Sequence, residues 1–141
     1  MGCDAYFRLY DIDDYDITLG RFQSGCFSES SDDHGVSVIC VDCATAANGS
    51  VCRHARASYA AIGEPPIFWK FSFADLPSGA RVEQKTVDGD DCHHNLHDIR
   101  RKDRERLVKK RPINDYIICT ENGEEEATQE KLAELKLRMK K

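Results

Sequence analysis

The stretch from Val36 to Ile62 limits the possible folds most, because it carries three cysteines and a histidine at metal-ligand spacing. Cys40 and Cys43 are separated by two residues and follow an apolar run that is typical of a strand. Cys52 and His54 flank a single residue, just before a run of small residues that favours a helix. Three thiolates and one imidazole form a tetrahedral set that structural zinc prefers. The sequence therefore predicts one Zn²⁺ bound by Cys40, Cys43, Cys52 and His54, where a strand end meets a helix start.

The second half of this set has to lie at the beginning of the helix. Residues two apart in a helix differ by about 200° of rotation, so Cys52 and His54 cannot both be ligands in its middle. Ser50 is placed to cap the helix, which leaves both ligands in or before the first turn. The alternative is that the cysteines bind no metal. Cys40 shares a strand face with Val38, and a free cysteine is often buried as a small apolar residue.

The run Cys52-Arg53-His54-Ala55 resembles the second half of the SWIM-type zinc finger, in which Cys-x-His is followed at once by a small-residue helix. The resemblance covers about twenty residues, and the first half differs, with C-x2-C in place of the C-x-C of that family. It implies a compact metal-held module that contacts nucleic acid or protein and does not catalyse a reaction at the metal.

Length and composition indicate one globular domain. The chain has 141 residues, of which 40% are hydrophobic and 32% charged, and no apolar run has the length of a membrane span. Seven cysteines, an odd number, and the lack of an export signal predict a reducing, cytoplasmic location. We expect no membrane association.

The expected fold class is α+β, with a mixed or antiparallel sheet of about five or six strands and three helices. Residues 1–121 form the zinc-stapled domain in this interpretation, and residues 122–141 form an amphipathic C-terminal helix that docks on it or pairs with another copy as a homodimer. The helices are expected over 51–62, over 96–110 and after Asn122. The clearest strand begins at Ile67, where large apolar residues alternate with others as far as Phe73.

The second of these helices is strongly basic. Between residues 100 and 111, eight lysines and arginines face only Asp103 and Glu105. Such a face attracts nucleic acid or an acidic protein surface. The residues expected to contact this partner are Arg100, Arg101, Lys102, Arg104, Lys109, Lys110 and Arg111. The alternative is a solvated helix with internal ion pairs, or one that docks on the acidic N-terminal region.

Residues 88–98 form a second candidate site. The segment concentrates Cys92, His93, His94 and His97 together with several aspartates. On a helix, His93 and His97 would share one face as a chelate, and His94 or His97 beside Asp98 could act as a general base. A surface loop that leads into a helix is the alternative.

Two other functions are compatible with the sequence. Arg8 on a first strand, followed by residues 20–24 and Phe27 on a second, is similar in order to the opening of small ADP-ribosyltransferase-like toxins, with Glu83 as the candidate catalytic glutamate. The enzyme alternatives are therefore ADP-ribosyl transfer and hydrolysis at the histidine cluster. The remaining alternative is an inhibitor, of the kind that phages and mobile elements encode, that masks a partner protein.

Overall fold

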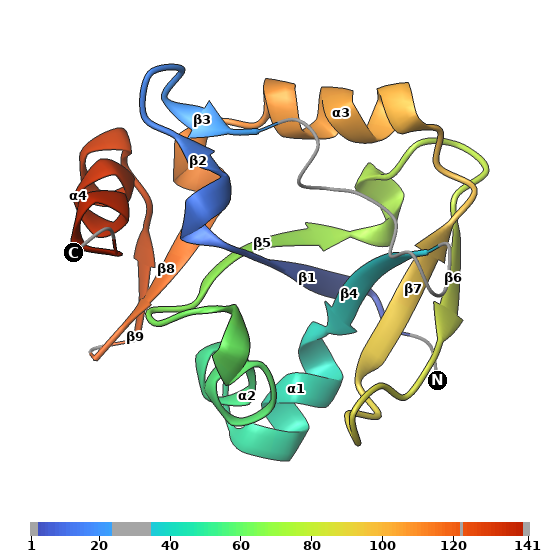
Figure 1. The fold of residues 1–141 in the computed structure, drawn as a ribbon. Helices are drawn as coiled ribbons and strands as arrows, with labels where there is room; N and C mark the ends of the chain where they lie inside the picture. Colours follow the sequence, from blue (N-terminus) through green and yellow to red (C-terminus); the bar gives the residue numbers. More distant parts are fainter. Residues whose placement is uncertain (1–2, 24–34, 122, 140–141) are drawn as a thin grey trace.

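A seven-stranded antiparallel sheet runs through the middle of the molecule in the computed structural model, which describes residues 3–23, 35–121 and 123–139 (Figure 1). Its strand order is β6-β7-β4-β1-β5-β8-β9. The strands are β1 (Ala5–Tyr10), β4 (Val36–Cys40), β5 (Ile67–Ser72), β6 (Arg81–Gln84), β7 (His93–His97), β8 (Tyr116–Thr120) and β9 (Gly123–Glu126). Two short strands, β2 (Tyr15–Asp16) and β3 (Arg21–Phe22), form a separate hairpin.

The central strands β1 and β5 are buried on both faces. Phe7 and Phe68 pack edge to face on one side of the sheet, with ring centroids 5.6 Å apart. Tyr6 and Trp69 belong to the larger core on the other side. The predicted alternation from Ile67 onward is confirmed as far as Phe71, whereas Phe73 lies beyond the strand and is exposed. Phe68, between Ile67 and Trp69, is also buried, but on the second face, because the strand is covered on both sides.

Two short helices cover one face of the sheet. α1 (Val41–Asn48) begins directly after β4 and ends at Gly49, whose φ of 91° is left-handed. α2 (Val51–Ser58) follows at once, and the Ser50 hydroxyl accepts a hydrogen bond from the Arg53 N–H at 3.1 Å. The predicted cap at Ser50 is therefore confirmed. The predicted helix over 51–62 is interrupted at Tyr59 and continues as a 3-10 turn, η3 (Ala60–Ile62).

The opposite face is covered by the β2–β3 hairpin and two further helices, α3 (Arg101–Lys110) and α4 (Gln129–Met139) (Figure 1). Val108 of α3 and Leu132 of α4 are fully buried in the larger core. α4 also packs against β2 and the 3-10 turn η1 (Ile12–Asp14). Two further 3-10 turns complete the fold, η4 (Phe73–Asp75) and η5 (Ile113–Asp115).

The α+β class is confirmed, but the predicted numbers of strands and helices are wrong. Nine strands and four α-helices stand within the described residues, against the five or six strands and three helices expected. The helix expected over 96–110 begins only at Arg101, because Leu96 pairs in β7 and Asp98 adopts a left-handed φ of 63° between the two elements.

The C-terminal helix also begins later than expected. Asn122, its expected cap, lies outside the described residues, and the glutamates that follow form β9 as the partner of β8. The helix starts at Gln129, with the Thr128 hydroxyl accepting from the Lys131 N–H at 3.1 Å. The division of the chain at 121 and 122 stays a prediction. In the described ranges, no helix combines the length and apolarity needed to cross a membrane.

Candidate functional site

Six cysteines are paired in three disulfides. The pairs are Cys3–Cys40, Cys43–Cys92 and Cys52–Cys119, with Cα–Cα distances of 6.0, 5.4 and 5.6 Å. The seventh, Cys26, lies outside the described residues. The first bridge joins β4 to the chain before β1, the second joins α1 to the residue before β7, and the third joins α2 to β8.

The structure does not bring the four predicted zinc ligands together. Cys40, Cys43 and Cys52 each form a disulfide with a different partner, and a disulfide sulfur is not the thiolate that zinc binds. Cys40 belongs to the core on the α3 side of the sheet, whereas Cys52 belongs to the core under α1 and α2. The prediction that Cys40, Cys43, Cys52 and His54 form one site is corrected on this point, and zinc binding as such stays a prediction.

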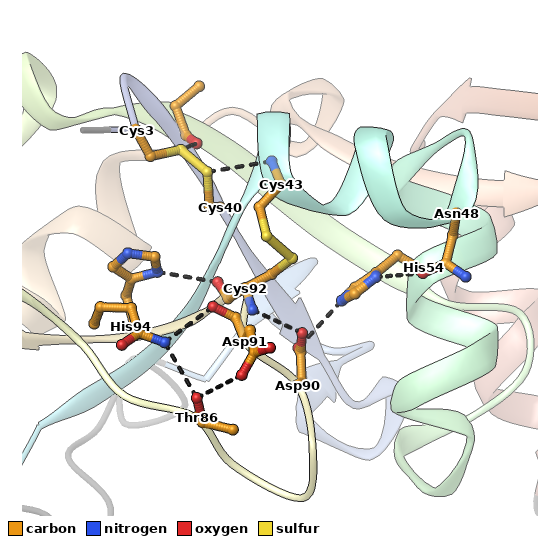
Figure 2. The surroundings of a disulfide bond; sticks show 12 residues. Cys3, Cys40, Cys43, Asn48, His54, Thr86, Asp90, Asp91, Cys92 and His94 are labelled. Carbon is orange, nitrogen blue, oxygen red and sulfur yellow. Dashed lines mark hydrogen bonds and ion pairs between the residues drawn. A yellow bond between two sulfur atoms is a disulfide. The ribbon is translucent and has the colours of Figure 1, made fainter. Parts of the chain in front are cut away.

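One cluster of possible metal ligands does exist among the described residues. It consists of His54, Asp90 and Cys92, whose ligand atoms lie within 4.8 Å of one another. All three residues are buried. His54 comes from α2, Asp90 from the turn between β6 and β7, and Cys92 from the residue before β7 (Figure 2). Cys43 of α1 adjoins the same cluster through its disulfide to Cys92.

The His54 ring is held at both nitrogens. Nδ1 lies 2.6 Å from Oδ1 of Asn48, and Nε2 lies 3.1 Å from Oδ2 of Asp90 (Figure 2). Because an amide oxygen only accepts hydrogen bonds, Nδ1 carries a proton and donates it to Asn48. Nε2 then faces the Asp90 carboxylate, and both atoms are of the kinds that bind metal ions. The hydrogen bond to Asn48 therefore fixes the ring with Nε2 directed at Asp90.

A tight turn places the Asp90 carboxylate inside the protein. Val87 and Asp90 form an isolated bridge across the turn, and Asp88 within it has a left-handed φ of 50°. The carboxylate accepts from the Cys92 N–H at 2.9 Å, from the Tyr59 hydroxyl and from His54. Burial by itself raises the pKa of Asp90, but these hydrogen bonds outweigh it and hold the pKa below its usual value. Burial and the hydrogen bond to Asp90 raise the pKa of Tyr59.

The histidine-rich segment is not one site. It lies on strand β7, so the helical chelate of His93 and His97 is wrong, because residues four apart on a strand are well separated. His93 contacts the Ser37 hydroxyl and the Lys85 carbonyl, and His97 contacts Glu83 at 3.3 Å. His94 lies against the Tyr6 ring, on the other face of the sheet. Asp98 pairs with Arg81 and with neither histidine proposed as a base.

Arg8 and Glu83 of the toxin-like resemblance are also far apart, and Ser24 and Phe27 lie outside the described residues. Arg8 lies on β1 and Glu83 on β6, with β4 and β7 between these strands. The Arg8 side chain lies on the same face of the sheet as Tyr6 and Tyr10. Glu83 contacts His97 on the opposite face. Arg8 donates to the Ser37 carbonyl at 2.7 Å. The geometry therefore does not favour Arg8 and Glu83 as partners in one catalytic site.

The predicted partner-binding residues of the basic segment fall into two groups. Arg100 pairs with Asp103 at 3.3 Å, Arg101 pairs with Glu105 at 3.0 Å, and Arg104 donates to the Ile99 carbonyl at 2.7 Å. Arg111 lies over the ring of Trp69. These four side chains have partners within the chain.

The second group is exposed. It comprises Lys102, Lys109 and Lys110, to which the structure adds Arg106, and we refer to these four residues as the basic face. Within residues 3–23, 35–121 and 123–139, no ion pair joins any of them to an acidic side chain. Residues 102, 106 and 109 follow one stripe of the helix, and 110 lies beside it. A groove of about 610 Å³ runs next to this face and is lined by Arg106, Lys110 and Trp69, among others.

Comparison of the chain with protein-family models, curated proteins and solved structures finds no match. The resemblance of residues 52–55 to SWIM-type zinc fingers therefore stays a sequence-based prediction. Asn48 and Tyr59, which contact the buried cluster, were not predicted. Asp90 lay within the second candidate segment, but the Asp-Gly-Asp pattern at residues 88–90 indicates only a turn and not the burial of its last carboxylate.

Proposed function

We propose that the protein is a disulfide-stabilised binding module that contacts a negatively charged partner, nucleic acid or an acidic protein, through the basic face of α3. The observation that carries this proposal is that four exposed cations lie together on one helix without an acidic partner in the described chain. A polyanion can therefore bind there without breaking an ion pair within the protein. Binding also releases counterions from the partner when that partner is a nucleic acid.

The structure of α3 supports this use of its surface. Arg100 and Arg101 are paired with acids of the same helix, and Val108 anchors the helix in the core. The basic face therefore projects from a fixed helix. Rigid presentation lowers the entropy lost on binding.

The disulfides favour a cellular compartment different from the one expected from the sequence. Structural disulfides persist in oxidising compartments and are rare in the cytosol. Three of them in one chain favour an oxidising compartment over the cytoplasmic location expected from the sequence. The proposal therefore includes function outside a reducing cytosol.

The test compares two charge reversals on opposite faces of the sheet. Lys109→Glu changes the basic face, and Arg53→Glu makes the same charge change on α2. The probes are a single-stranded DNA oligonucleotide and poly-L-glutamate, titrated at several salt concentrations. We expect salt-sensitive binding of one probe by the wild-type protein, and Lys109→Glu should weaken it about tenfold while Arg53→Glu leaves it nearly unchanged.

The probe that binds identifies the chemistry of the partner. If DNA binds, we compare how steeply the logarithm of the binding constant falls with the logarithm of the salt concentration. A slope that is smaller by about one in Lys109→Glu than in the wild type indicates phosphate contacts. Binding of poly-L-glutamate alone indicates an acidic protein. If neither probe binds, or if the two variants lose affinity equally, the proposal is wrong.

A further inference from the structure

We infer that reduction of the Cys43–Cys92 disulfide creates a zinc site, in which the two cysteine sulfurs, His54 Nε2 and the Asp90 carboxylate are the four ligands. The cluster of His54, Asp90 and Cys92 supplies three of them within 4.8 Å of one another. Cys43 adjoins this cluster through its bond to Cys92, and its side chain would supply the fourth ligand once reduction frees it to turn. Two thiolates, an imidazole and a carboxylate form an ordinary tetrahedral donor set for zinc.

Two of the four ligand atoms already lie at a distance that suits such a site. Zinc bonds to nitrogen and oxygen are about 2.0–2.1 Å, so two such ligands at tetrahedral corners lie about 3.3 Å apart. His54 Nε2 and Asp90 Oδ2 already lie 3.1 Å apart. Two sulfurs bound to one zinc lie about 3.8 Å apart, which reduction of the S–S bond allows.

The hydrogen-bond partners of His54 and Asp90 are of the kind that support ligands in metal sites. A ligating histidine usually donates its other ring N–H to an oxygen, which fixes the ring and its tautomer. Here Nδ1 of His54 donates to Oδ1 of Asn48 at 2.6 Å. A ligating carboxylate is usually held by hydrogen bonds as well, and Asp90 accepts from the Cys92 N–H and the Tyr59 hydroxyl.

The redox step is a two-electron exchange with a dithiol. The dithiol becomes a disulfide and passes two electrons and two protons to the Cys43–Cys92 bond, which yields two thiols. Both thiols lose their protons when Zn²⁺ binds, so zinc and oxidation compete for the same two sulfurs. The inference does not rest on binding by the basic face, because that face lies on the other side of the sheet.

The first experiment uses the wild-type full chain. The protein is reduced with dithiothreitol, which is then removed without oxygen, and cobalt(II) or zinc(II) is added. We expect one metal ion per chain, with a cobalt–thiolate charge-transfer band, and no uptake by the oxidised protein. Failure of the reduced protein to bind either metal would overturn the inference.

Cysteine alkylation then locates the site without any mutation. Iodoacetamide labelling of the reduced chain, with and without zinc, is mapped by mass spectrometry. We expect zinc to slow labelling of Cys43 and Cys92 at least tenfold and to change little at Cys3, Cys40, Cys52 and Cys119. Protection of a different pair of cysteines would contradict the proposed ligand set.

Two variants test the ligands that are not cysteines. His54→Gln removes a ligand, and His97→Gln is the matched control on β7, outside the cluster. We expect zinc affinity to fall by more than tenfold in the first and to stay unchanged in the second. Asn48→Ala, which alters only the support of His54, should weaken binding about 10–100-fold. Circular dichroism shows whether each variant is folded, and unchanged affinity in folded His54→Gln would refute the assignment.

Discussion

The guanidinium of Arg111 lies over the indole ring of Trp69, at the point where α3 ends beside β5. Trp69 also stacks on Phe71, with ring centroids 4.5 Å apart. A stacked guanidinium both attracts the electron-rich ring and covers it from water. This contact fastens the C-terminal end of the basic helix to a central strand of the sheet.

Arg111→Ala should therefore loosen this end of α3. We expect the free energy of unfolding to fall by about 1 kcal/mol and the fluorescence emission of Trp69 to move to longer wavelength as water reaches the ring. The protein has one tryptophan, so the emission reports on this position alone. Lys110→Ala is the control and should leave the emission unchanged. An unchanged spectrum in Arg111→Ala would show that the arginine does not cover the ring.

The docking of the C-terminal helix gives a second prediction. Leu132 is completely buried, whereas Leu137 on the same helix is 58% exposed. We expect Leu132→Ala to lower the free energy of unfolding by about 2–5 kcal/mol and Leu137→Ala by less than about 0.5 kcal/mol. Denaturant titration of the disulfide-intact variants measures both. Equal, small effects would mean that α4 does not pack on η1 and β2 in solution.

The buried carboxylate gives a prediction about acid stability. Because the pKa of Asp90 is lowered in the folded protein, its ionised form contributes stability above the unfolded-state value of about 3.9. This contribution is lost as the pH falls through the folded-state pKa. We expect Asp90→Asn to cost about 1–3 kcal/mol at pH 7, and the gap to wild type to narrow below about pH 4.

The control for this prediction is Asp91→Asn, the exposed neighbour of Asp90. Denaturant unfolding at pH 7 and at pH 3 measures both variants against the wild type. A gap between wild type and Asp90→Asn that stays constant over this range would contradict the assigned hydrogen bonds.

The parts of the fold that follow local patterns were predictable. The apolar alternation of β5 and the Ser50 cap of α2 depend on residues close together in the chain, and both are confirmed. α1 was missed because its eight residues look like a turn between Cys40 and the next helix. β7 was missed because its five residues become a strand only through pairing with β4 and β6.

The candidate site was only partly predictable, because it depends on contacts between distant residues. The disulfides join cysteines 37, 49 and 67 positions apart, and six cysteines allow 15 pairings that spacing cannot distinguish. The sequence identified Cys43, His54 and Cys92 as potential ligands but assigned them to two different sites. Asp90 gave no signal beyond its turn, since only the fold shows which of several aspartates is enclosed.

The last strand of the sheet has a consequence for how copies of the molecule meet. β9 ends the strand order, and its residues, Gly123 followed by Glu124, Glu125 and Glu126, are all exposed. A second chain that added its own β9 there would place rows of carboxylates side by side at neutral pH. Repulsion between these glutamates thus opposes edge-to-edge pairing of sheets from different molecules. Acidification would protonate the carboxylates and remove this repulsion.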